Sequence, residues 1–150
     1  MELQANGRSL MAVLTIFLAV LVSTTVSFAD ETTEDVDGIL VENAQVIRIQ
    51  SDENRAQLKF SVSNFGTNDV TLVGLSSEVA GGIEMYFFSS DGTKQMVTDL
   101  TVLQEETLNL ASSHIKIDLV DVKRELNPGM KVEFKLNFRG FHSLAMADVH

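Results

Sequence analysis

Residues 132–138 read Val-Glu-Phe-Lys-Leu-Asn-Phe, and apolar and polar side chains alternate in them without exception. Residues 58–63, Leu-Lys-Phe-Ser-Val-Ser, have the same alternation. Successive side chains of a strand point to opposite faces, so a period of two predicts a strand with one face in a core and the other in water. Both segments are therefore predicted to be strands of a half-buried sheet.

Further strands are expected on both sides of these two segments. The turn residues Asp91-Gly92 and Asn127-Pro128-Gly129 stand between apolar runs, where the chain must reverse. No convincing helical period is found after Ala29. The chain is predicted to be an all-β sandwich of Greek-key type with eight or nine strands. The other expected strands cover residues 41–49, 70–75, 83–88, 95–103, 107–110, 115–119 and 143–149.

The segment 1–29 has the features of a cleavable signal peptide. Residues 10–22, LMAVLTIFLAVLV, are apolar and uncharged but shorter than the ~20 residues that span a bilayer. Val26-Ser27-Phe28-Ala29 then provides small residues for cleavage before Asp30. The alternative is an uncleaved N-terminal anchor. Cleavage predicts a periplasmic protein with no membrane segment, an acidic lead-in over residues 30–39 and one domain over residues 40–150.

Composition excludes several functions. The formal net charge of −10 argues against nucleic acid and anionic membrane surfaces as partners. The absence of cysteine excludes a thiol nucleophile, a lipid-bearing cysteine and a blue-copper centre, which needs a Cys sulfur. No phosphate loop, GxSxG or HExxH motif occurs. The chain is predicted not to be an enzyme.

Thioether side chains are the remaining candidates for chemistry. After the leader the chain contains Met85, Met96, Met130 and Met146, as well as His114. Methionine sulfur and histidine nitrogen suit Cu(I). Methionine also fills hydrophobic cores, so a single Met is no signal for a metal site by itself. Only a set of donors that converge would indicate one.

Five segments follow one another in a recognisable order: Leu72-Val73-Gly74-Leu75-Ser76-Ser77, Ile83-Glu84-Met85-Tyr86, Met96, His114-Ile115-Lys116-Ile117-Asp118-Leu119, and residues 126–134, LNPGMKVEF. This order resembles the periplasmic copper chaperones of the PCu(A)C type. The resemblance implies a cupredoxin-like β-sandwich that binds copper as Cu(I) and helps to load it into a respiratory oxidase subunit. The competing hypothesis is a metal-free β-sandwich module of the same family that acts through protein–protein contacts.

The resemblance also implies a ligand set. His114 corresponds to the His of the family's His-x-Met motif, and Met96 to its central Met. The first ligand column has two candidates, since the motif's spacing selects Met85 and ungapped matching selects Tyr86. Neighbouring residues of a strand face opposite sides, so only one of them can point at the site. The spacer between Met96 and His114, residues 97–113, is shorter than in the family.

Lys116 is the clearest departure from the family motif, because it stands where the motif has its last Met. An ammonium group has no lone pair to donate. Two unit charges 4 Å apart repel by roughly 4 kcal/mol at an effective dielectric constant of ~20. Cu(I) affinity is therefore predicted to be weakened, unless Asp118 two residues later neutralises Lys116.

The C-terminal segment holds the donors His142, Met146 and His150. His142 and Met146 share a strand face but are about 13 Å apart at strand rise. They are therefore predicted to belong to an ordinary last strand, not to a second metal site.

Overall fold

The computed structural model describes residues 38–150. The predicted signal peptide, its cleavage before Asp30 and the lead-in up to residue 37 lie outside the described residues. Within residues 38–150 no helix is long and apolar enough to span a bilayer.

The alternating segments form strands, as predicted, and the described residues form no α-helix. The all-β prediction is confirmed. Ten strands are present over residues 38–150: β1 (Ile39–Arg48), β2 (Arg55–Asn64), β3 (Val70–Ser76), β4 (Ala80–Phe88), β5 (Lys94–Met96), β6 (Leu100–Val102), β7 (Thr107–Asn109), β8 (Lys116–Val122), β9 (Lys131–Phe138) and β10 (Phe141–Val149).

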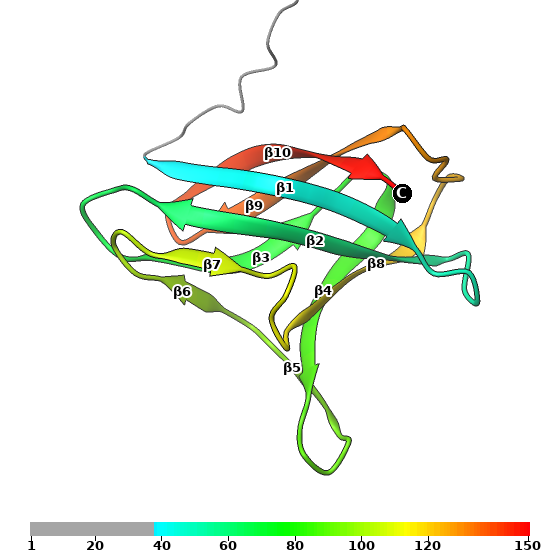
Figure 1. Cartoon of the computed structure of the whole chain (residues 1–150), viewed down its shortest axis with the longest axis horizontal. Helices are drawn as coiled ribbons and strands as arrows, with labels where there is room; N and C mark the ends of the chain where they lie inside the picture. Colours follow the sequence, from blue (N-terminus) through cyan, green and yellow to red (C-terminus); the bar gives the residue numbers. More distant parts are fainter. Residues whose placement is uncertain (1–37) are drawn as a thin grey trace, which may run out of the picture. The chain divides into compact units, whose positions relative to one another are not determined.

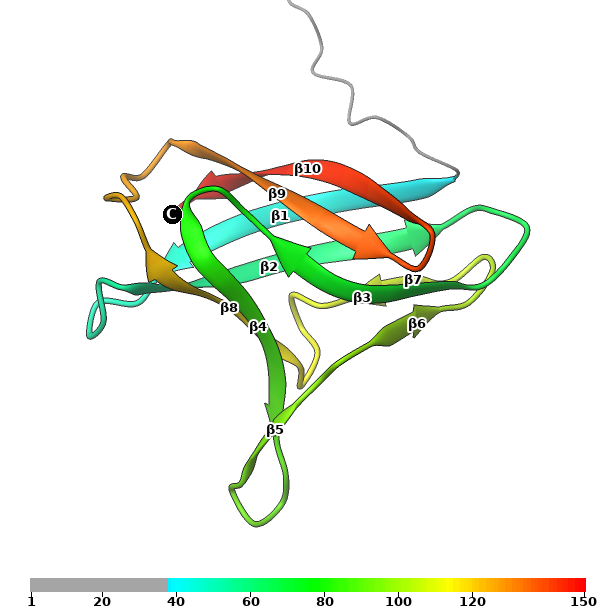
Figure 2. The same cartoon turned by 180° about the vertical axis from the view of Figure 1, so that it is seen from behind.

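The strands pair in the order β5-β4-β8-β2-β1-β10-β9-β3-β6, and β7 pairs with β2. All pairs are antiparallel except β1 with β10. The sheet folds back on itself, so that β1 and β2 lie in one layer and β3 and β4 in the other (Figures 1 and 2). The strands β5 and β6 are the two ends of this path, which makes them edge strands.

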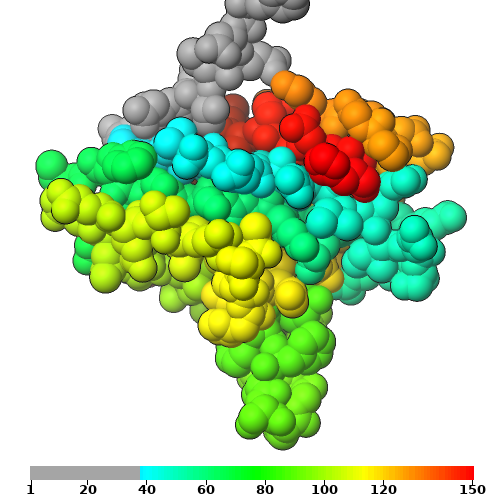
Figure 3. All heavy atoms as spheres, viewed as in Figure 1, coloured from blue at the N-terminus to red at the C-terminus, as the bar shows by residue number. Residues whose placement is uncertain are grey.

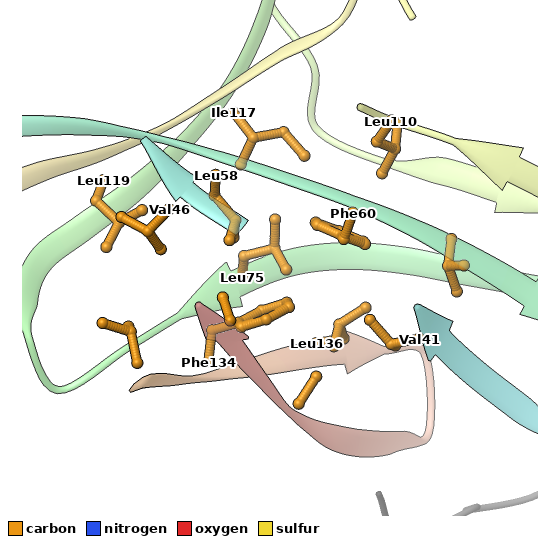
Figure 4. Packing of buried hydrophobic residues seen from close by; sticks show 14 of the residues in the cluster. Val41, Val46, Leu58, Phe60, Leu75, Leu110, Ile117, Leu119, Phe134 and Leu136 are labelled. Carbon is orange, nitrogen blue, oxygen red and sulfur yellow. The ribbon is translucent and has the colours of Figure 1, made fainter. Parts of the chain in front are cut away.

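The core lies between the two layers and contains the apolar half of each alternating segment. In β9, Val132, Phe134, Leu136 and Phe138 are all buried. The rings of Phe60 and Phe134 are 5.3 Å apart between centroids, and Figure 4 shows side chains of β2, β8 and β9 pointing toward one another. Each large apolar side chain buried in this way contributes about 1.5–3 kcal/mol to folding.

The structure differs from the simple half-buried pattern at the end of β2. Ser61 and Ser63 were expected in water, yet they are 8% and 3% exposed. At this end of β2, one edge pairs with β1 and the other pairs with β7. The hydroxyls of Ser63 and Thr107 are 2.7 Å apart. Hydrogen bonding lets a small hydroxyl be buried at low cost.

The predicted single strand over residues 95–103 is wrong, because the structure divides it into β5 and β6. The strand β5 pairs with β4, whereas β6 pairs with β3 at the other end of the sheet path. The chain therefore crosses from one edge to the other between Met96 and Leu100. A period of two does not reveal such a change of pairing partner.

Candidate metal centre

A tight turn at the tip of the β4–β5 hairpin fixes the register of the candidate site. The Asp91 carboxylate accepts hydrogen bonds from the Ser89 hydroxyl at 2.6 Å and the Thr93 amide at 3.0 Å. Gly92 has a φ of 81°, which glycine adopts without strain. The Ser89 amide donates to the Thr93 carbonyl at 3.0 Å, so the two strands are locked side by side. The hairpin projects from the rest of the described domain (Figure 3).

This register places three candidate residues in one row across three strands. Tyr86 of β4 lies opposite Met96 of β5 on one side and opposite Lys116 of β8 on the other. Residues directly opposite one another share a face of the sheet. Met96 is 54% exposed, so its thioether is accessible. The row therefore contains one soft donor, one phenol and one ammonium group.

Met85 lies on the opposite face of β4 from this row. It pairs with Ile117, is 5% exposed and packs in the hydrophobic core. The structure does not bring Met85 to Met96, although the spacing of the two residues in the sequence suggested it. Tyr86 shares a face with Met96 instead.

His114 lies just before β8, two residues from Lys116, and is exposed. Its ring meets the ring of Phe87 edge-on, with centroids 5.8 Å apart and planes at 80°. Phe87 follows Tyr86 in β4. Successive side chains of a strand point to opposite faces, so Phe87, and with it the His114 ring, lies on the other face of β4 from Tyr86 and Met96. His114 and Met96 are thus near the same end of β4 but on opposite faces of it.

Sequence reasoning missed an ion-pair network that occupies this face. The Arg55 guanidinium Nη2 lies 3.0 Å from the Asp118 Oδ2 and 3.2 Å from the Glu84 Oε2. The Tyr86 hydroxyl donates to the same Asp118 oxygen at 3.0 Å. Asp118, at 4% exposure, therefore bonds Arg55 and Tyr86 rather than Lys116. Arg55 gave no signal in the sequence because it comes from β2, far from the motif.

Lys94 completes the network from β5. Its Nζ is 2.8 Å from the Glu84 Oε2 and 4.1 Å from the centroid of the Tyr86 ring. Three cations thus lie on this face with the two carboxylates of Glu84 and Asp118. The cations are Arg55, Lys94 and Lys116. The balance of +1 opposes the approach of a metal cation.

The pKa values of two groups reflect this environment. Burial raises the pKa of Tyr86, and the hydrogen bond to Asp118 and its negative charge raise it further. The phenol is thus protonated at neutral pH and donates its proton to Asp118. The hydrogen bond from Lys94 lowers the pKa of Glu84 despite partial burial. Glu84 is therefore ionised at neutral pH and holds Lys94 over the Tyr86 ring.

The other sulfur and imidazole groups lie elsewhere. Met130 is half-buried, and the Asn127 amide lies 3.2 Å from its sulfur in the Asn127-Pro128-Gly129 turn. His142 and Met146 lie on β10, which pairs with β9 along its whole length. Within residues 38–150, no three or more His, Asp or Glu side chains gather into a group that could hold a metal ion.

The family model with the description "lipoprotein LpqE-like" matches residues 39–147 of this chain. The sequence contains no cysteine to carry a lipid. A search among curated proteins gives no match.

Solved structures show the same fold. The copper-bound PCuAC domain from PmoF2 is 20% identical, with a TM-score of 0.65 over 77% of this chain and 94% of that domain. The apo PCuAC domain from PmoF1 is 19% identical, with a TM-score of 0.66 over 79% and 98%. Apo-DR1885 from Deinococcus radiodurans is 20% identical, with a TM-score of 0.58 over 96% and 95%. The predicted cupredoxin-like β-sandwich of PCuAC type is confirmed.

Proposed function

The chain belongs to the LpqE-like family, and from this premise we propose that it is an exported copper-handling protein of the chaperone type. Cu(I) binds at the β5–β4–β8 edge through the Met96 thioether and the His114 imidazole. These soft and borderline donors suit Cu(I). The copper-bound PCuAC domain from PmoF2, which has the same fold, supports this assignment.

The arrangement around Tyr86 and Phe87 carries the proposal. Met96 lies opposite Tyr86 in the register of the hairpin, and the His114 ring contacts Phe87, the next residue. Two donors that are well separated in sequence thus lie near the same end of β4, on opposite faces of it, and both are exposed. A shared Cu(I) ion requires these two side chains to turn toward each other. The site has fewer donors than the family motif, because Tyr86 and Lys116 occupy the other columns. Binding is therefore weaker than a full ligand set would give.

The same proposal includes the location of the protein in the cell and the acceptor of its copper. The signal peptide expected over residues 1–29 and a family described as lipoproteins both support a location outside the cytoplasm, which we take to be the periplasm. The acceptor is a subunit of a respiratory oxidase, as the resemblance to PCu(A)C chaperones implies. Met96 is exposed at the projecting hairpin, where a second protein can contact it.

The ion-pair network favours a second candidate function, a metal-free module that acts through protein contacts. The Tyr86 hydroxyl is hydrogen-bonded to Asp118, and the Lys94 ammonium lies over the Tyr86 ring. The position of the first metal ligand in the family motif is therefore engaged in contacts within the protein. Phe88 and Met96 are 59% and 54% exposed on the same face of the hairpin. A contiguous patch of exposed apolar side chains is typical of an interaction surface, and Phe88 and Met96 are exposed apolar side chains on one face of this hairpin.

A Cu(I) titration against a competing chelator separates the two candidates. We expect His114→Ala to weaken Cu(I) binding at least about tenfold, because it removes one of two donors. His142→Ala, the matched control on β10, should leave the dissociation constant unchanged. The metal-free module is favoured instead if the wild type does not compete for Cu(I) or if both variants behave as it does.

A further inference from the structure

A cavity at one end of the sandwich has the features of an anion site. It lies between the loop that follows β1 and the loop that follows β8, and its volume is about 560 Å³. Figures 1 and 2 show both loops at the same end of the described domain. We propose that this cavity binds a small polyvalent oxyanion that carries phosphate or carboxylate groups.

The charge of the cavity lining is opposite to that of the chain. Four basic residues line it, Arg48, Arg55, Lys123 and Arg124, against two acidic ones, Glu53 and Glu125. The lining thus has a balance of +2, whereas the chain has a net charge of −10. Four of the eleven Lys and Arg residues of the chain gather at this one place. A concave surface with an excess of one sign of charge concentrates ions of the opposite sign.

Three of these cations have no carboxylate partner among residues 38–150. The Arg55 guanidinium is held by Asp118 and Glu84. No ion pair within residues 38–150 involves Arg48, Lys123 or Arg124, although carboxylates line the same cavity. Cations that line one cavity and are not paired with a carboxylate repel one another, and a bound anion relieves that repulsion.

Backbone hydrogen bonds hold the frame of the cavity. The Val122 amide donates to the Asn54 carbonyl at 3.0 Å, and the Lys123 amide to the Val79 carbonyl at 2.9 Å. The loop after β1 is closed by the bond from the Asp52 amide to the Ile49 carbonyl at 3.0 Å. The backbone that carries the cations is thus ordered before an anion arrives, which lowers the entropic cost of binding.

The lining indicates the chemical class of the ligand. Arginine binds phosphate and carboxylate groups through two parallel N–H bonds. The volume lies within the ~300–1,000 Å³ of small-molecule sites. Ile49, Val122 and Leu126 give the cavity an apolar wall that accommodates a small carbon skeleton. Both a free anion and a lipid headgroup have this chemistry.

The test is calorimetric titration of the full chain with inorganic pyrophosphate and with citrate at constant ionic strength. We expect saturable binding, weakened about tenfold in Arg124→Gln and in Arg48→Gln, because each loses a charge-assisted hydrogen bond. The matched control is Arg139→Gln, which makes the same change of charge at an exposed residue outside this cavity. Its effect should be less than about twofold at physiological salt.

The outcomes separate the sources and the alternatives. Binding of phosphatidylglycerol vesicles that depends on Arg124 and accompanies pyrophosphate binding would identify a headgroup phosphate as the source. Absence of binding for both soluble anions would overturn the proposal. An equal loss in Arg139→Gln would also overturn it, since the affinity would then come from overall charge. Cu(I) affinity of Arg124→Gln should equal that of the wild type, so that failure here is distinct from failure of the copper site.

Discussion

The Tyr86 hydroxyl donates a 3.0 Å hydrogen bond to the buried carboxylate of Asp118. This bond determines what the candidate metal centre can do. Tyr86 lies between Met96 and Lys116 in the row across three strands, so the central position of the row is committed to an internal contact. A metal ion near this edge must therefore rely on Met96, at one side of Tyr86, and on His114, whose ring lies against Phe87.

The Tyr86–Asp118 bond can be measured directly, because Tyr86 is the only tyrosine and the chain has no tryptophan. We expect the phenolate absorbance to titrate above the ordinary value of 10.0, as burial and the Asp118 carboxylate both raise the pKa of Tyr86. Asp118→Asn should lower that pKa, since the charge and the anionic acceptor disappear. Asp148→Asn on β10 is the control and should have no effect. Identical titrations of wild type and Asp118→Asn would contradict the bond.

Acid should weaken the Glu84 ion pairs. The pKa of Glu84 is lowered in the folded protein, chiefly by the hydrogen bond from Lys94. A lowered carboxyl pKa adds stability above the unfolded-state value, here 4.5, and that stability is lost as pH falls through the folded-state pKa. The free energies of unfolding of wild type and Glu84→Gln, measured in urea, should therefore differ most near pH 7. The difference should shrink toward about pH 3. A difference that is independent of pH would show that the ion pairs contribute nothing.

Met85→Leu and Met96→Leu should differ in their effect on Cu(I) affinity. Met85 is buried in the core, so Met85→Leu should change the free energy of unfolding by less than about 1.5 kcal/mol and leave Cu(I) affinity unchanged. Met96→Leu removes an exposed donor and should weaken Cu(I) binding about tenfold with little effect on stability. Chelator competition and urea unfolding give the two readouts. Loss of Cu(I) binding in Met85→Leu alone would contradict the assignment.

Lys116 should limit Cu(I) affinity. Replacing Lys116 by Met removes a positive charge two residues from His114 and adds a thioether at the position of the family motif. We expect affinity to rise about tenfold or more, with exposure and salt reducing the charge contribution. Lys116→Gln removes only the charge and should recover part of the gain. If Lys116→Met binds Cu(I) no better than the wild type, the remaining donors do not converge near His114.

Local pattern was enough to predict most of the fold. The alternation in residues 58–63 and 132–138 predicted strands, and Asp91-Gly92 predicted the hairpin turn that the structure contains. The change of partner between β5 and β6 was not predictable, because pairing is decided by distant strands. The burial of Ser63 has the same cause, since β7 comes from a distant part of the chain.

The candidate site was predictable only in part. The sequence led to Met96, His114 and Lys116 through a resemblance, but spacing alone could not decide between Met85 and Tyr86. That choice depends on the register of the hairpin, because a shift of the pairing by one residue moves each side chain to the other face of the sheet. The Arg55 contact to Asp118 joins residues 63 positions apart, and a pair so distant in sequence leaves no local pattern.

The most direct test of the copper assignment is X-ray absorption of the Cu(I)-loaded protein at the copper edge. We expect sulfur and nitrogen scatterers together in the first coordination shell. Met96→Leu should lose the sulfur and keep the nitrogen, whereas Met85→Leu should keep both. A wild-type spectrum with only nitrogen or oxygen ligands, or one that Met96→Leu leaves unchanged, would contradict the copper assignment.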